Sequence, residues 1–279
     1  MAGRVILFGW DSMRRAAWVC AVTVLGALIL FQAKVWMNLK ADQQYLTHLM
    51  DTIADPALPP SAQTLALLGY LREKPPQTNR AYFLNREFAF LRPTAREVAE
   101  NGGNCADRSR FVVVMLKIHG IHASKWALYA PNGRPAHAVV EVDSEQGKMV
   151  ADPLYGIWFP KPGGGFYGIQ ELRNNPEILK QRLGELRAAP LPYGVMDIRK
   201  YPLDHYVYSD PRTVNWDKSA ITHHFYGFLH ALFGARINQI TRPDWSEQPA
   251  DMVLLMSFAL EVILFLALIP LFFYRKRVN

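Results

Sequence analysis

Residues 102–116 read GGNCADRSRFVVVML and join a turn to an apolar helix. The paired glycines offer the positive φ at which helices commonly end, and Asn104 is a preferred N-cap for the helix that follows. We therefore expect a new helix that starts at Cys105 and runs to Gly120. The unpaired amides and the dipole at its start favour a thiolate at Cys105, and the same amides are suited to binding an oxyanion.

The sequence on either side of this helix predicts the fold class. TARE at residues 94–97 is a capping box, so a short helix starts there. After Gly120 the apolar residues change to a period of two, which predicts strands over residues 123–130, 136–142 and 148–152. A helix followed by an antiparallel meander is an α+β arrangement. Half of the residues are hydrophobic, which excludes a disordered chain.

Two polar residues of the expected meander suit nucleophilic catalysis with Cys105. His137 lies in the second strand and Asp152 at the end of the third. Over the helix start, His137 can exchange the proton of the thiol while Asp152 orients the imidazole. A lone cysteine is more often a small buried hydrophobe, but Cys20 lies in an apolar run and leaves Cys105 without an intrachain disulfide partner. From the residues alone, catalysis and a structural role stay even alternatives.

Three motifs around these residues resemble the bacterial transglutaminase-like superfamily, a papain-related group with a Cys-His-Asp triad. They are GNCAD at 103–107, PAHAVVEV at 135–142 and VADPLYG at 150–156. The spacing agrees as well, with 32 residues from Cys105 to His137 and 15 more to Asp152. The resemblance covers residues 96–159 and departs from the family at Val139, where an aromatic residue is frequent.

The resemblance implies a transglutaminase-like, papain-like core over residues 94–165. Cys105 would be the nucleophile, His137 the general base and acid, and Asp152 the orienting carboxylate. Such an enzyme acts on amide or peptide bonds through a thioester, as a protease or amidase with water and as an acyltransferase with an amine. No cofactor or metal is expected. The alternative is a non-catalytic binding or assembly module of an envelope or polysaccharide-export complex. The candidates for the substrate cleft are Asn104, Tyr155 and Trp158.

Two apolar runs indicate a membrane anchor. Residues 16–33 are an uncharged run of 18, about 27 Å as a helix, and residues 252–274 carry one charge, Glu261. A cleaved signal peptide is the competing interpretation of the first run, but its end lacks the small residues of a cleavage site. Basic residues lie outside both runs, so the positive-inside rule predicts cytoplasmic termini. We expect a bacterial inner-membrane protein with a periplasmic main domain.

The expected organisation follows from these features. Its parts are a cytoplasmic tail (1–15), a transmembrane helix (16–36), a helical segment (37–93), the catalytic core (94–165), an extension (166–251), a second transmembrane helix (252–274) and a cytoplasmic tail (275–279). Further helices are expected over residues 35–54, 62–73 with Ser61 as cap, 176–187 and 216–237. The aromatic residues of the last of these favour core packing over the alternative, a position on the bilayer surface.

Glu261 and the net charge bear on partners. A carboxylate in the middle of a span is costly, so we expect Glu261 to contact Thr23, Gln32 or another membrane subunit, or to be protonated and face the other helix. Of the formal charge of +7, +5 lies on residues 1–15 and 275–279. The basic composition is therefore a topology signal and does not indicate nucleic acid. The expected partners are the bilayer and a protein or peptide-containing envelope substrate.

Overall fold

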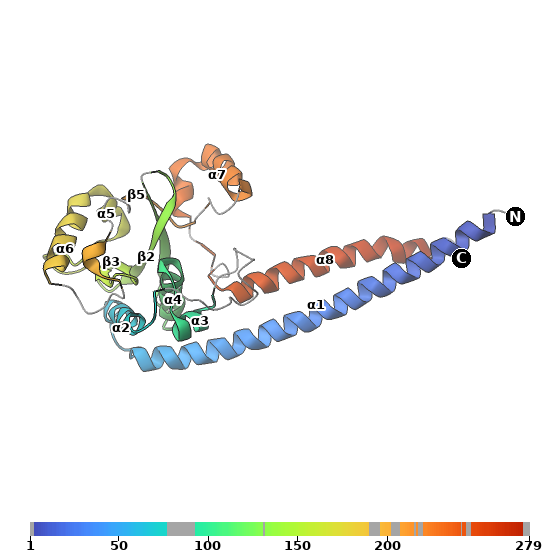
Figure 1. Ribbon diagram of the computed structural model, residues 1–279, viewed down its shortest axis with the longest axis horizontal. Helices are drawn as coiled ribbons and strands as arrows, with labels where there is room; N and C mark the ends of the chain where they lie inside the picture. The colour runs from blue at the N-terminus through green and yellow to red at the C-terminus, as the bar shows by residue number, and fades with distance from the viewer. Residues whose placement is uncertain are drawn as a thin grey trace. The chain divides into compact units, whose positions relative to one another are not determined.

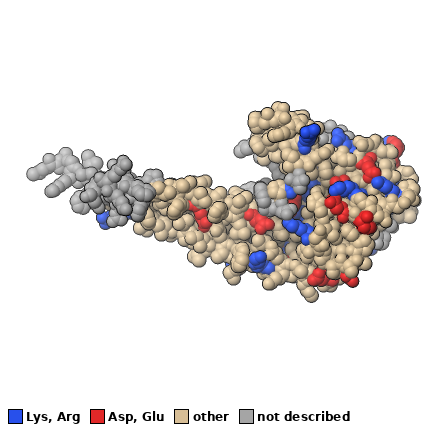
Figure 2. Space-filling model, turned by 180° about the vertical axis from the view of Figure 1, so that it is seen from behind, with Lys and Arg blue, Asp and Glu red and all other residues tan. Residues whose placement is uncertain are grey.

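The chain forms two compact units in a computed structural model. The structure describes residues 3–76, 93–130, 132–189, 196–201, 207–214, 216, 220–240, 242–243 and 247–275. The first unit, here the helix unit, comprises Met1–Gln43 and Gln248–Asn279, and the second, the αβ unit, comprises Gln44–Glu247. On the face shown in Figure 2, Lys, Arg, Asp and Glu side chains gather over the αβ unit and are few along the described part of the long helices.

The helix unit consists of helix α8 (Pro249–Arg275) and most of helix α1 (Gly3–Ile53), the two helices that are long and apolar enough to cross a membrane. Helix α1 is a single helix of 51 residues, and α8 has 27. The apolar stretches that meet the length and composition of a span are Arg15–Ile53 and Pro249–Ile269. Their large apolar side chains are exposed, Leu30 by 74% and Ile263 by 62%. Exposed apolar side chains along a whole helix are more compatible with a lipid environment than with water.

The αβ unit is built on one antiparallel sheet of five strands in the order β4-β3-β2-β1-β5. Figure 1 labels three of these strands, β2, β3 and β5. The strands are β1 (Ala123–Tyr129), β2 (Pro135–Ser144), β3 (Gly147–Asp152), β4 (Ile157–Trp158) and β5 (Val207–Arg212). The expected meander is confirmed as β1 to β3, with Val140 opposite both Lys125 and Ala151. The sequence did not predict β4, which has two residues, or β5, which comes from far along the chain and pairs with β1.

Two apolar cores lie on the two faces of the sheet, because successive residues of a strand point to opposite faces. Val140 and Val142 of β2 pack in the first core with Met50 of α1. This core also contains side chains of α2 (Pro60–Arg72), α3 (Ala95–Asn101) and α4 (Cys105–Ile118). Val139 packs in the second core, with side chains of α6 (Pro176–Ala188), α5 (Ile169–Asn174) and the 3-10 helix η1 (Ile198–Lys200). The fold class α+β is confirmed.

Two helix predictions need correction. Helix α2 begins at Pro60, and Ser61 does not cap it, because its hydroxyl donates to Glu145 Oε1 at 2.6 Å. The helix expected over 216–237 is shorter, with α7 (Ala220–Phe233) followed by the 3-10 helix η3 (Gly234–Gln239). Part of the helical segment expected over 37–93 and most of the tail expected over 275–279 lie outside the described residues.

Candidate active site

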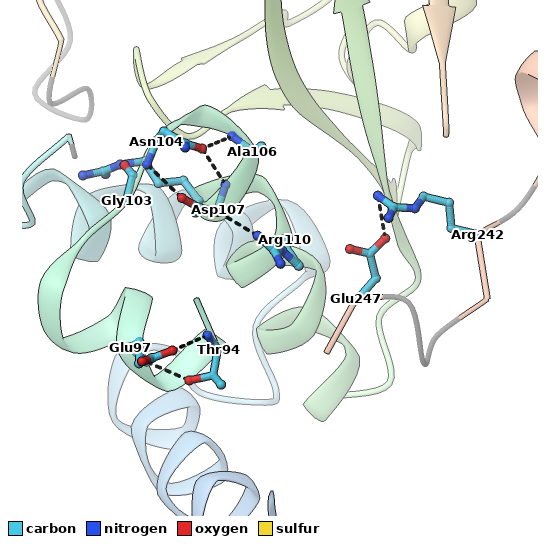
Figure 3. Close-up of polar contacts among 10 residues, drawn as sticks. Thr94, Glu97, Gly103, Asn104, Ala106, Asp107, Arg110, Arg242 and Glu247 are labelled. Carbon is cyan, nitrogen blue, oxygen red and sulfur yellow. Dashed lines mark hydrogen bonds and ion pairs between the residues drawn. The ribbon is translucent and has the colours of Figure 1, made fainter. Parts of the chain in front are cut away.

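The turn before Cys105 is shaped by glycine and closed by Asn104. Helix α3 ends at Gly102, whose φ is +77° and where a Cβ would lie 2.1 Å from the Pro75 carbonyl oxygen, so only glycine fits. The Asn104 side-chain oxygen accepts hydrogen bonds from the Ala106 amide at 3.0 Å and the Asp107 amide at 3.1 Å. The Asp107 carboxylate accepts in return from the Asn104 amide, which completes a capping box (Figure 3).

This cap sets the environment of Cys105. Cys105 is the first residue of α4 and its side chain is half-buried. Two of the first three amides of the helix are used by the Asn104 side chain, so the Cys105 amide is the one of the three left for an oxyanion. Asn104, predicted as a cleft residue, uses its side chain as the cap. The predicted N-cap Asn104 is thus confirmed, and so is the predicted capping box of Thr94 with Glu97 at the start of α3.

Arg108 holds the segment behind this turn in place. Its side chain is completely buried and donates to four backbone carbonyls at 2.6–2.7 Å, those of Gly103, Leu71, Lys74 and Pro75. Burial lowers the pKa of Arg108 to about 10, against the opposing charges of Asp152 and Asp107. The side chain therefore remains a cation at neutral pH and joins the end of α2 to the turn before Cys105. Sequence reasoning missed this residue, since a charge beside an apolar run does not reveal its carbonyl partners.

His137 and Asp152 form a completely buried pair. The His137 Nε2 atom lies 2.6 Å from Asp152 Oδ2, and both side chains are 0% exposed. The other carboxylate oxygen of Asp152 accepts from the amides of Leu154 at 2.9 Å and Tyr155 at 3.1 Å. The turn after β3 thus fixes the carboxylate, and the carboxylate fixes the imidazole ring.

Cys105 lies beside this pair and completes the predicted group of three. Burial lowers the pKa of His137, but the charge and hydrogen bond of Asp152, followed by the hydrogen bond and charge of Cys105, raise it to about 10. Asp152 occupies Nε2, and the second ring nitrogen, Nδ1, is buried as well. His137 is therefore an imidazolium at neutral pH.

Two tyrosines pack around the imidazole. The ring of Tyr155 meets that of His137 edge-on at 5.8 Å, and Tyr201 does so at 6.3 Å. The two tyrosine rings also meet each other, at 4.7 Å. Tyr155 was predicted from its place after Asp152, whereas Tyr201 follows η1, 49 residues after Asp152, and no sequence signal indicated it. These rings shield the histidine from water.

Trp158 lies elsewhere. It is half-buried against the first core, the guanidinium of Arg182 lies over its ring at 5.7 Å, and Arg182 also donates to its carbonyl. Its neighbour Ile157 packs in the second core with Tyr155, so Trp158 is on the opposite face of the sheet.

Among the described residues no cluster of three His, Cys, Asp or Glu side chains is placed to hold a metal ion.

Glu261 was predicted to have a contact within the membrane. The Thr23 hydroxyl donates to the Val19 carbonyl of its own helix at 2.8 Å. Gln32 Nε2 and Glu261 Oε1 are both buried, and neither has a hydrogen-bond partner among the described residues. The partner of Glu261 stays a prediction.

Comparison of the chain with protein-family models, curated proteins and solved structures gives no match. The geometry of Cys105, His137 and Asp152 therefore carries the functional proposal on its own.

Proposed function

We propose that this protein is a membrane-anchored cysteine enzyme of the transglutaminase-like kind, which acts on amide or peptide bonds. The observation that supports the proposal is the buried pair of His137 and Asp152, 2.6 Å apart, with Cys105 beside the imidazole at the start of a helix. A structural role would not require a buried charged pair next to a half-buried thiol. Perturbed ionisable groups held together in this way are typical of catalytic sites.

The first half of the reaction forms a thioester. The Cys105 thiolate attacks the carbonyl carbon of the substrate, and the negative charge that develops on the carbonyl oxygen is bound by the Cys105 amide. The bond from carbon to nitrogen then breaks, and the His137 imidazolium gives its proton to the departing amine. Asp152 holds the ring in position and stabilises its charged form.

The second half of the reaction releases the acyl group. Neutral His137 takes a proton from water or from an acceptor amine as it attacks the thioester, and the carbon–sulfur bond breaks. Water gives a carboxylic acid, as in a protease or amidase, and an amine gives a new amide, as in an acyltransferase. The Cys105 thiolate and the His137 imidazolium are restored, so the cycle needs no cofactor.

The substrate class follows from the proposed topology. With both termini in the cytoplasm, the αβ unit faces the periplasm of a bacterial cell, where peptide-containing envelope components are the available amides. The two apolar helices and the basic flanks of the sequence support this topology.

A covalent probe tests the proposal. Full-length protein in detergent is treated with biotin-tagged peptidyl chloromethyl ketones, and the modified residue is located by mass spectrometry. We expect labelling of Cys105 that the His137→Gln variant reduces at least tenfold, while Cys20→Ser, the matched control, labels as the wild type does. Equal labelling of the wild type and of His137→Gln would contradict the proposal and leave a non-catalytic binding module.

A further inference from the structure

Helix α7 presents an apolar stripe to the outside of the αβ unit. The α7 stripe is Phe225, Phe228 and Leu232, which follow one another at the i, i+3, i+7 spacing of one helix face. Their side chains are exposed by 51%, 60% and 61%. The opposite face carries His223 and His230, both exposed. The helix is therefore amphipathic, but its apolar side is the uncovered one.

Contacts on a third side of α7 hold the helix in this orientation. The ring of Tyr226 stacks on Trp216 at 6.0 Å, and its hydroxyl donates to the side chain of Asn238 at 3.0 Å. The guanidinium of Arg212, at the end of β5, lies over the same ring at 4.9 Å. These contacts turn Tyr226 toward the αβ unit. Phe225, at the edge of the α7 stripe, also meets the Trp216 ring at 6.2 Å, while Phe228 and Leu232 remain the most exposed of the three. Helix α7 stands apart from the other helices of the unit (Figure 1). The sequence analysis predicted that the aromatic residues of this helix pack into the core, and for the exposed α7 stripe that prediction is wrong.

Charge and chain length indicate what covers the stripe. Residues 218–240 contain no Asp or Glu, while Lys218 and Arg236 are basic, so the segment is complementary to an anionic surface. Arg242, farther along the chain, is paired with Glu247 at 3.1 Å (Figure 3) and adds nothing to this charge. Helix α8 begins at Pro249, and the 15 residues between α7 and α8 span at most roughly 50 Å. A bilayer crossed by α8 is therefore within reach of α7.

We infer that α7 lies in the interface of the bilayer that α8 crosses, with the α7 stripe among the acyl chains and the histidine face toward water. This inference rests on the proposed membrane anchoring. An amphipathic helix of this kind buries its apolar side roughly 5–10 Å below the headgroups. The αβ unit, which carries the candidate active site, is then held at the membrane surface by a third point, in addition to the two spans.

Spin labels measure the depth of α7 directly. The full chain, with Cys20→Ser and Cys105→Ser, is reconstituted in nanodiscs of phosphatidylethanolamine and phosphatidylglycerol. Nitroxides are attached at Phe228→Cys and, on the opposite face, at His223→Cys. Relaxation by oxygen, which concentrates in the acyl region, is compared with relaxation by a water-soluble nickel complex. We expect the ratio of oxygen relaxation to nickel relaxation to be at least threefold higher at position 228 than at position 223.

Two further labels separate the inference from the anchoring. Ile263→Cys in α8 reports on the span, and Lys180→Cys, exposed on α6, is the aqueous reference. A lipid-like ratio at Ile263→Cys with an aqueous ratio at Phe228→Cys would overturn the inference and leave the anchoring intact. Aqueous ratios at both would overturn the anchoring itself and the inference with it. Protection of position 228 from both reagents would show a protein partner on the stripe and would also overturn the inference.

Discussion

The substitution Asp152→Asn tests whether the Asp152 carboxylate keeps His137 protonated. It keeps the shape of the side chain and removes the charge that contributes most to raising the pKa of His137. The pKa of His137 is about 10 against an ordinary value of 6.5, and each pH unit corresponds to about 1.4 kcal/mol. With the carboxylate gone, burial opposes the charged ring and only Cys105 still favours it. We expect the pKa to fall by about 3 pH units, or about 4 kcal/mol.

The assay is a titration of the imidazole by nuclear magnetic resonance. Protein with ¹³C-labelled histidine is titrated in detergent, and the signal of His137 is assigned by its absence in His137→Gln. In the wild type the imidazolium signal should titrate with a midpoint near pH 10, and in Asp152→Asn with a midpoint near pH 7. A wild-type midpoint near 6.5, or a fall of less than about 1 pH unit in the variant, would refute the reasoning.

Three further predictions concern stability. Folding raises the pKa of His137, so the contribution of this residue to stability is complete below about pH 6.5 and is lost as the pH rises to about 10. The free energy of unfolding should fall by roughly 1.4 kcal/mol per pH unit between these two values. The Asp152→Asn variant should lack this slope. Arg108→Met leaves four carbonyls without their donor and should cost about 3–5 kcal/mol, measured by denaturant unfolding, against less than about 1 kcal/mol for the exposed Arg96→Gln. Asn104→Ala removes the cap of α4 and should cost about 1 kcal/mol by the same measurement, while Asn104→Asp should cost less.

Each of these has a result that contradicts it. A free energy of unfolding that is flat or rises between pH 6.5 and 10 would disprove the raised pKa of His137. Equal stability of Arg108→Met and Arg96→Gln would show that the carbonyl contacts contribute nothing. An Asn104→Ala variant as stable as the wild type would show that the Asn104 cap does not stabilise the start of α4, where Cys105 lies.

Local signals in the sequence predicted the elements that form around Cys105. The two capping boxes and the period-two strands depend on residues a few positions apart, so α3, α4 and β1 to β3 could be located without knowledge of the rest of the chain. The closeness of His137 and Asp152 followed from the meander, because neighbouring strands bring such residues together.

Features that depend on distant partners could not be predicted in this way. Ser61 has the chemistry of a cap, but Glu145, 84 residues later, takes its hydroxyl. Tyr201 reaches His137 only through the second core. The aromatic residues of α7 suited either a core or a bilayer surface, and only the tertiary contacts of Tyr226 show which side faces outward.

The rate of Cys105 alkylation at pH 7 tests the central claim most directly. Iodoacetamide reacts with the thiolate, so its rate reports whether neighbouring groups activate the thiol. In a Cys20→Ser background we expect Cys105 to react roughly tenfold faster than in the same background with His137→Ala. Equal rates in both proteins would contradict the claim that Cys105, His137 and Asp152 act as one catalytic group.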